Sequence, residues 1–211
     1  MSETESHRNP TRVNETSAGQ TTGHLFIVSA PSGAGKSTLC EAVRRQFPKL
    51  AYSISYTTRP PRSNERHGRD YFFITVEEFK KGIAEGRWAE WAKVHKNYYG
   101  SSARWIQQTL QTGGDILMDI DLQGARQMLR RFPDAITVFI MPPSMEELER
   151  RLCIRGTESR ETIALRLANA KEEIARKDVC RYSIVNDDLE KATRELAALV
   201  GRYLDATVSP T

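Results

Sequence analysis

Apolar residues along this 211-residue chain gather in short runs, and between the runs apolar and charged residues alternate at helical spacing. The four clearest runs are residues 25–30, 116–120, 135–141 and 182–185. Apolar runs of this length are typical of strands buried on both faces, and helices between strands favour parallel pairing. The pattern therefore predicts an α/β fold built on a largely parallel sheet.

The most regular helical pattern covers residues 159–177. Ile163, Leu167, Ala170 and Ile174 fall on one face of this segment, which predicts a long amphipathic helix. The charged residues on its other faces are expected to be solvated.

Three further helix starts carry the capping-box pattern, in which a small polar or acidic residue is followed three positions later by glutamate. The pairs are Thr75 with Glu78, Ser144 with Glu147, and Asp187 with Glu190.

Residues 53–104 differ in character from the rest of the chain. Residues 52–57, 70–74 and 88–94 have β-like composition, and a helical pattern over 75–86 lies among them. We expect residues 53–104 to form an inserted α/β lobe.

The remaining residues are expected to form the core and a tail. The core comprises residues 23–52 and 105–211, with a lid at about 142–170. Residues 1–22 are polar and lack the apolar segment of a secretory signal, so they are expected to be a disordered tail.

Composition excludes several classes of protein. With 39% hydrophobic and 27% charged residues the chain is typical of soluble globular proteins, and no apolar stretch approaches the roughly 20 residues that span a bilayer. The net charge of +4 is modest and scattered, so nucleic acid is not an expected partner. The three cysteines, Cys40, Cys153 and Cys180, form no Cys-x-x-Cys pair, which favours reduced thiols in the cytoplasm over disulfides or zinc.

Residues 30–38, which begin at the end of the first apolar run, have the composition of a phosphate-binding loop. Backbone N–H groups that curl around phosphate oxygens need small residues, which Gly33 and Gly35 supply. Lys36 would reach the β- and γ-phosphates, and the Ser37 hydroxyl would bind Mg²⁺. Ala30 stands where the pattern usually has its first glycine, and an ordinary glycine-rich turn is the alternative. The candidate triphosphate-binding residues are Ala30, Pro31, Ser32, Gly33, Ala34, Gly35, Lys36, Ser37 and Thr38.

The predicted lobe contains a second candidate phosphate site. Arg59 and Arg62 stand three residues apart on a segment stiffened by Pro60 and Pro61, and a rigid pair of guanidinium groups suits a phosphate dianion. The hydroxyls of residues 98–101 are further candidate donors. A solvated basic turn and tyrosines that only pack are the alternatives.

Two carboxylates follow the second apolar run. Asp119 at the end of the predicted strand can meet Mg²⁺ through water or touch an acceptor nucleotide. Asp121 is the weaker candidate, since it suits the N-cap of a helix over residues 122–131.

Several motifs in order resemble the guanylate kinase family. They occupy residues 29–37, 57–62, 97–100, 117–124, 142–144, 155–158 and 184–188, and the resemblance covers about residues 24–205. It implies a P-loop nucleoside monophosphate kinase fold. It also implies transfer of the γ-phosphate of ATP to GMP and dGMP, with Mg²⁺ as cofactor; the products with GMP are ADP and GDP.

The resemblance also implies site residues. It assigns GMP binding to Ser55, Arg59, Arg62, Tyr71, Glu90, Tyr99 and Ser101, to which Asp119 is added as a candidate contact. It assigns catalytic roles to Lys36, Arg62, Arg155 and Arg166, and contacts beside the adenine to Asn186 and Asp187. Glu90 suits guanine because a carboxylate accepts from both N1–H and the 2-amino group, although by itself it would be interpreted as a surface glutamate. Asp187 is equally compatible with a helix cap alone.

A general base is not required, because the second pKa of a phosphate monoester is about 6. His67 and His95 are therefore interpreted as surface residues. Two alternatives to a guanylate kinase stay open: a non-catalytic guanylate-kinase-like domain that binds proteins, and a kinase for another nucleoside monophosphate. The sequence gives no oligomeric state.

Overall fold

The structure is a computed structural model that describes residues 23–94, 96–154 and 159–206. The predicted tail, His95 and the candidate catalytic residue Arg155 lie outside the described residues.

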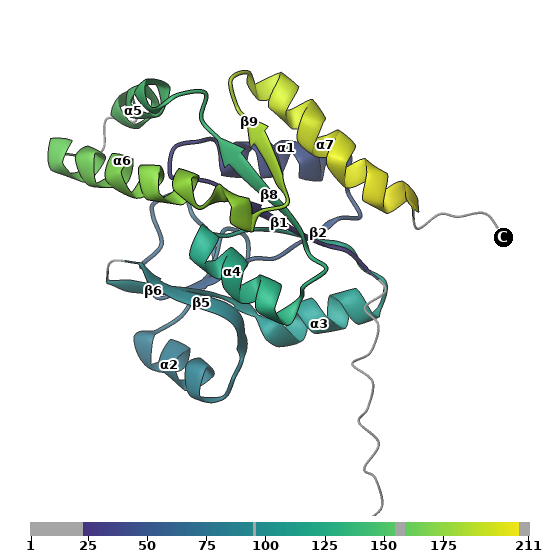
Figure 1. Cartoon of the computed structure of the whole chain (residues 1–211). Coiled ribbons are helices and arrows are strands. Elements are labelled where there is room, and N and C mark those ends of the chain that lie inside the picture. The colour runs from purple at the N-terminus through teal and green to yellow at the C-terminus, as the bar shows by residue number, and fades with distance from the viewer. Residues whose placement is uncertain (1–22, 95, 155–158, 207–211) are drawn as a thin grey trace, which may run out of the picture.

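A five-stranded parallel sheet forms the centre of the molecule (Figure 1). Its strands, in spatial order, are β2 (Ala51–Tyr52), β7 (Ile116–Asp119), β1 (Leu25–Ser29), β8 (Ile136–Met141) and β9 (Tyr182–Val185). The four strands predicted from apolar runs are all present, and the predicted α/β fold is confirmed.

Helices cover both faces of this sheet because side chains alternate along each strand. In β1, Phe26 and Val28 pack toward α1 (Lys36–Gln46) and α7 (Leu189–Ala206). The intervening residues Leu25 and Ile27 pack toward α3 (Ala103–Gln111) and α4 (Leu122–Arg131). Both faces are dry, which explains the unbroken apolar run in the sequence.

A second sheet of four strands and helix α2 (Val76–Ala84) lie beside the carboxyl edge of the core (Figure 1). The strands, in spatial order, are β4 (Phe72–Phe73), β3 (Tyr56–Thr57), β6 (Asn97–Ser102) and β5 (Trp88–Val94). These elements fall within the segment expected to form a lobe. The side chain of Gln127 on α4 fastens β5 to the core, because it bonds both the N–H (3.2 Å) and the carbonyl (2.8 Å) of Trp91.

Two helices pack together over the phosphate-binding loop. They are α5 (Met145–Ile154) and α6 (Arg160–Ala175), and a short 3₁₀ helix, η1 (Lys177–Val179), follows. Leu148 and Leu152 of α5 pack against Ala170 of α6. The predicted apolar face of α6 therefore packs inward, with Ala170 buried and Ile163, Leu167 and Ile174 partly buried, and the helix extends past residue 170, where the lid was expected to end.

The capping-box predictions had different outcomes. Thr75 forms the complete box with Glu78. The Ser144 hydroxyl accepts from the Glu147 N–H (3.1 Å), but the Glu147 carboxylate binds Arg150 and Arg151 on its own helix.

The prediction for Asp187 as a helix cap is wrong. Helix α7 begins at Leu189, so Asp188 is the capping residue and accepts from the N–H of Lys191 (2.7 Å). Asp187 instead accepts from the Asp188 N–H (2.9 Å).

No helix within the described residues has both the length and the apolar composition needed to cross a membrane.

We predict that Thr75→Ala lowers the free energy of unfolding by about 1 kcal/mol, because the Glu78 N–H loses its hydroxyl acceptor, while the backbone N–H at position 75 can still donate to the Glu78 carboxylate. Urea denaturation measures the difference. Thr75→Ser is the matched control, since it keeps the hydroxyl and should stay within about 0.5 kcal/mol of the wild type. Equal losses in the two variants would contradict a capping role.

Candidate active site

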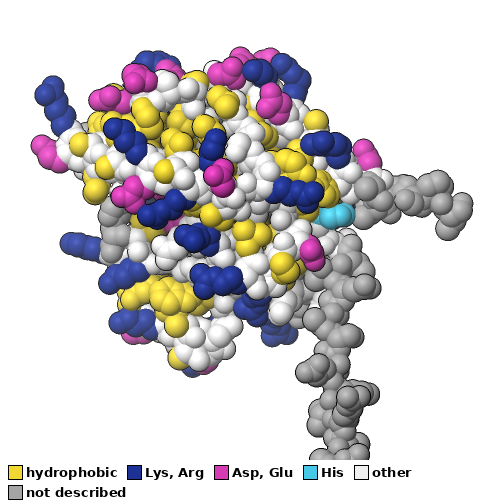
Figure 2. Space-filling model, viewed as in Figure 1, with side chains coloured by type: hydrophobic (Ala, Val, Ile, Leu, Met, Phe, Trp, Pro, Cys, Tyr) yellow, Lys and Arg dark blue, Asp and Glu magenta, His cyan; other side chains and the backbone are white. Residues whose placement is uncertain are grey.

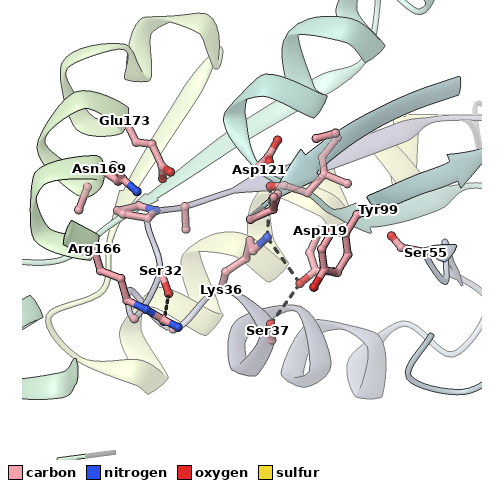
Figure 3. A pocket seen from close by; sticks show the side chains of 18 of the residues that line it. Ser32, Lys36, Ser37, Ser55, Tyr99, Asp119, Asp121, Arg166, Asn169 and Glu173 are labelled. Atoms are coloured by element: carbon pink, nitrogen blue, oxygen red, sulfur yellow. Dashed lines mark hydrogen bonds and ion pairs between the residues drawn. The ribbon is translucent and has the colours of Figure 1, made fainter. Parts of the chain in front are cut away.

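A cleft of about 590 Å³ opens where the phosphate-binding loop, the second sheet and α6 meet (Figure 3). Most of the residues predicted for the two phosphate sites line it together. From the loop these are Ala30, Pro31, Ser32, Gly33, Gly35, Lys36, Ser37 and Thr38, and from the other elements Ser55, Arg59, Arg62, Tyr71, Glu90, Tyr99, Asp119 and Arg166.

The loop takes a conformation that only glycine adopts easily at two positions. Gly33 and Gly35 both have a φ of 94°, in the left-handed region. Gly35 is the N-cap of α1, so the loop leads directly into the first turn of that helix. The N–H groups of a helix N-terminus and its dipole favour anions, which is the environment a phosphate group needs.

A buried hydrogen bond from Asn186 stabilises the conformation of this loop. Its side-chain amide donates to the carbonyl of Ala34 (2.8 Å), and Asn186 is only 5% exposed. A Cβ at Gly35 would lie 2.3 Å from the same amide nitrogen. Asn186 therefore fixes the loop's shape, and neither it nor Asp187 lines the cleft in this structure.

Lys36, Ser37 and Asp119 converge at the floor of the cleft (Figure 3). Asp119 Oδ2 accepts from the Ser37 hydroxyl (3.2 Å) and lies 3.8 Å from Lys36 Nζ, which also donates to the carbonyl of Ile120 (3.2 Å). The strand register causes this convergence, since Val28 of β1 pairs with Asp119 of β7 just before the loop begins.

Tyr52 holds the other oxygen of this carboxylate. Its hydroxyl donates to Asp119 Oδ1, and the guanidinium of Arg44 lies over its ring, 4.1 Å from the centroid. Burial, followed by the charge of Asp119, raises the pKa of Tyr52, so the hydroxyl stays a donor. Tyr52 was not predicted as a site residue, because a tyrosine that ends a short edge strand carries no distinguishing signal in the sequence.

The donor set at this point fits a magnesium ion. A serine hydroxyl and a carboxylate are hard oxygen ligands, and Mg²⁺ is commonly held by one or two carboxylates together with substrate phosphates. No group of three or more His, Cys, Asp or Glu side chains suited to a metal occurs in the described part of the chain. The protein thus supplies a partial site that a nucleotide's phosphates would complete.

Arg59 and Arg62 lie on a loop organised by Glu65. The Arg59 guanidinium makes a two-pronged ion pair with the Glu65 carboxylate (both bonds 2.9 Å), which also accepts from the Arg62 N–H (2.8 Å). The hydrogen bond from Arg59 lowers the pKa of Glu65. This pair fixes the direction of Arg59, whereas the Arg62 side chain is 73% exposed. Sequence analysis missed Glu65, although its spacing after the two arginines was a usable signal.

Glu90 is buried at the inner end of the cleft, with only 5% of its surface exposed. Its Oε1 accepts from the Ser101 hydroxyl (2.7 Å), and Ser101 lies behind it instead of lining the cleft. Desolvation raises the pKa of Glu90 to about 7, although the Ser101 bond opposes the rise; the charge of Asp121 adds to it. A buried carboxyl with a raised pKa is a frequent mark of a functional site.

Asp121 lines the cleft but caps α4, since its carboxylate accepts from the N–H of Gly124 (2.7 Å). The capping role that the sequence favoured is thereby confirmed.

Helix α6 presents a polar face to the cleft (Figure 3). Arg166 donates to the Ser32 hydroxyl of the loop (2.8 Å), and Asn169 and Glu173 follow along the same face. Burial raises the pKa of Glu173 to about 7, assisted by the charge of Asp121 and opposed by that of Lys36. The expectation that the charged residues of this helix are solvated is wrong for Glu173.

Spacing alone contained signals for these missed residues. Asn169 and Glu173 stand three and seven positions after Arg166, which is one helix face. Ala92 and Val94 line the cleft at two and four positions after Glu90, which is one strand face.

The face of the molecule seen in Figure 2 is mixed in charge. Figure 2 shows Lys and Arg side chains spread over both the upper and lower parts of the face in view, with acidic side chains among them.

Comparison with known proteins identifies close relatives. The family model described as guanylate kinase matches residues 22–203. The chain is 49% identical over 178 residues to the guanylate kinase of Syntrophotalea carbinolica, covering 84% of this chain and 85% of that one. It is 48% identical over 191 residues to the guanylate kinase of Geobacter sulfurreducens, covering 87% and 94%. The crystal structure of guanylate kinase from Anaplasma phagocytophilum superposes with a TM-score of 0.70 at 30% identity, covering 90% and 89%.

We predict that Glu90→Gln reduces the pH dependence of stability. A carboxyl whose pKa rises from 4.5 to about 7 on folding binds a proton more tightly in the folded state, so stability falls as pH rises through this window. Removing this titration should flatten the slope between about pH 5 and pH 7 by up to about 1.4 kcal/mol per pH unit. Denaturation at several pH values measures it.

Glu172→Gln is the control, since that side chain is 71% exposed on α6 and should keep the wild-type slope. The same slope for Glu90→Gln and the wild type would contradict the buried titration.

Proposed function

The chain belongs to the guanylate kinase family, and from this premise we propose that its cleft transfers the γ-phosphate of ATP to GMP or dGMP, giving ADP and GDP or dGDP. The observation that carries the proposal is the presence, in one cleft, of a phosphate-binding loop and a buried carboxylate, with an arginine- and tyrosine-lined wall beside them. A loop alone would fit many nucleotide-binding proteins.

The donor half is the loop with Lys36 and Ser37. The loop's N–H groups and the α1 dipole bind the phosphates of ATP, and Lys36 neutralises charge on the β- and γ-phosphates. Asn186 and Asp187 are proposed to lie beside the adenine; the bond from Asn186 to Ala34 supports the loop in either case.

Mg²⁺ would be held by Ser37 directly and by Asp119 through water. Bound there together with ATP, the ion would offset the negative charge of the phosphates. The Tyr52 hydroxyl keeps the Asp119 carboxylate turned so that Oδ2 faces Ser37 and Lys36.

The acceptor half is the wall formed by Ser55, Arg59, Arg62, Tyr71 and Tyr99. Arg59 is oriented by Glu65 before any ligand arrives, so little side-chain entropy is lost when its remaining N–H groups meet a phosphate. The Arg62 side chain is largely exposed and makes a long ion pair with Glu65 (3.9 Å), which it would exchange for a bound phosphate.

Glu90 would recognise the base, and Ser101 behind it would hold Oε1 of its carboxylate in place. Guanine offers N1–H and the 2-amino group as donors, and an ionised Glu90 accepts from both, whereas the N1 of adenine is an acceptor. With a pKa of about 7, Glu90 is partly protonated in the free protein, and binding of the guanine donors favours the carboxylate. The wrong base would leave this buried group unpaired, which is a costly mismatch.

Catalysis would come from alignment and charge neutralisation. The GMP phosphate is already a nucleophile, so no side chain needs to remove a proton. Lys36, Arg62, Arg155 and Arg166 are proposed to stabilise the moving phosphoryl group, with the lid closing to exclude water. The bond from Arg166 to Ser32 supports this role, since it brings α6 to the loop.

The alternative of a non-catalytic interaction domain is not favoured, because such a domain has no need to keep Lys36, Ser37, Arg155 and Arg166. A cytoplasmic location stays a prediction.

The proposal is tested by measuring ADP release with GMP, dGMP, AMP, CMP and UMP. We expect turnover with GMP and dGMP and little with the others. Glu90→Gln should raise the KM for GMP at least tenfold, or about 1.4 kcal/mol, because the amide nitrogen meets a guanine donor. Equal activity with AMP and GMP would refute the base specificity, and no ADP release with any acceptor would favour the interaction domain.

We predict that Tyr52→Phe raises the Mg²⁺ concentration needed for half-maximal activity several-fold, because Asp119 loses the bond that orients it. Turnover at saturating Mg²⁺ should stay near the wild-type value. Tyr203→Phe is the matched control. Tyr203 lies in α7 and does not line the cleft, and among the hydrogen bonds described its hydroxyl bonds only that of Tyr182. An unchanged Mg²⁺ dependence would show that Tyr52 serves packing alone.

A further inference from the structure

Gly124 occupies a helical position that does not call for glycine. It is the third residue of α4, its φ is not in the left-handed region, and alanine is favoured over glycine by about 1 kcal/mol within helices. The reason for glycine must therefore lie in what surrounds it.

The surroundings leave no room for a methyl group. A Cβ at Gly124 would lie 2.7 Å from Oε2 of Glu90 and 3.3 Å from Oδ1 of Asp121, and the first distance is shorter than any ordinary contact. The atom at 2.7 Å belongs to the carboxylate of the buried Glu90, so the absence of a side chain at position 124 determines where that carboxylate can lie.

Neither α4, which carries Gly124, nor β5, which carries Glu90, can easily move away from the other. Gln127 ties α4 to the backbone of β5 through both hydrogen bonds of Trp91, and the Asp121 cap fixes the first turn of the helix. Glu90 stands on β5 itself, and its Oε1 is held by Ser101. The part free to move is the rotatable end of the Glu90 side chain.

We propose that Gly124 is a positioning residue for binding of the acceptor base, because its missing side chain leaves the space in which Oε2 of Glu90 lies. This inference rests on the proposed function, in which the two oxygens of Glu90 accept from the guanine base. A methyl group at position 124 pushes Oε2 away and breaks the paired geometry, while the loop, Lys36 and the arginines keep their places.

The first test is Gly124→Ala, measured by steady-state kinetics with GMP and ATP varied separately. We expect the KM for GMP to rise about tenfold, as for one lost buried hydrogen bond to a charged group. The kcat and the KM for ATP should stay within about twofold, because no donor-side group moves.

Gly201→Ala is the matched control, since Gly201 also lies in a helix and its added Cβ would make only an ordinary contact, 3.7 Å from Phe47. It should leave all three constants unchanged. A KM for GMP unchanged in Gly124→Ala would overturn the inference.

A double-mutant cycle with Glu90→Ala separates this inference from the proposed function. If Glu90→Ala alone leaves the KM for GMP unchanged, the assignment of Glu90 to guanine fails, and the inference fails with it. If Glu90→Ala raises it, Gly124→Ala should have no further effect in that background, because the carboxylate it displaces is gone. An equal effect of Gly124→Ala in both backgrounds would mean that it acts through α4, which overturns the inference.

Thermal unfolding covers the case in which Gly124→Ala does not fold. The Glu90→Ala/Gly124→Ala variant has space for the methyl group, so recovery of folding in the double variant supports competition for that space. Failure of both to fold would refute it.

Discussion

The register between β1 and β7 is the constraint on which the rest of the site depends. Parallel strands end at the same edge of a sheet, and pairing of Val28 with Asp119 sets the end of β7 beside the start of the phosphate-binding loop. Lys36 can then reach the carbonyl of Ile120, and Ser37 can reach Asp119. The chain leaves β2 at this edge, forms the second sheet there, and returns through α3 to begin β7 at the opposite edge, so the second sheet is held where its arginines and Glu90 face the loop. One hydrogen-bonded register therefore brings together three segments far apart in sequence.

The cleft concentrates charges that the fold only partly compensates. Glu90 and Glu173 lie in places where burial disfavours their ionised forms, and the charge of Asp121 acts on both in the same direction. Lys36 opposes these shifts but is itself engaged with Asp119 and a carbonyl. Burying carboxylates in this way lowers the stability of the folded protein. A binding site accepts this loss, because groups that bind a substrate cannot have all their hydrogen bonds filled by the protein itself. Arg59 is the contrasting case, because Glu65 satisfies and directs it in advance.

Local pattern was a sufficient guide to much of the fold and to parts of the site. The four apolar runs predicted the central strands, since strands buried on both faces must be continuously apolar. The capping box at Thr75 and the cap at Asp121 followed from chemistry contained within four residues. The cap at Asp187 was misplaced by one residue, because Asp187 has a glutamate three positions later, whereas Asp188, which caps the helix, is followed at that spacing by Lys191.

The sequence by itself determined the elements, the phosphate-binding loop and, through its ordered motifs, the family, because each is encoded in neighbouring residues. Tertiary structure alone decided which side chains meet. Tyr52 reaches Asp119, Glu173 turns into the cleft, and Gly124 leaves the space that the Glu90 carboxylate occupies. These contacts join residues between 34 and 67 positions apart or depend on which face of a helix is covered. Their distances are set by strand register and helix packing, which no local pattern contains.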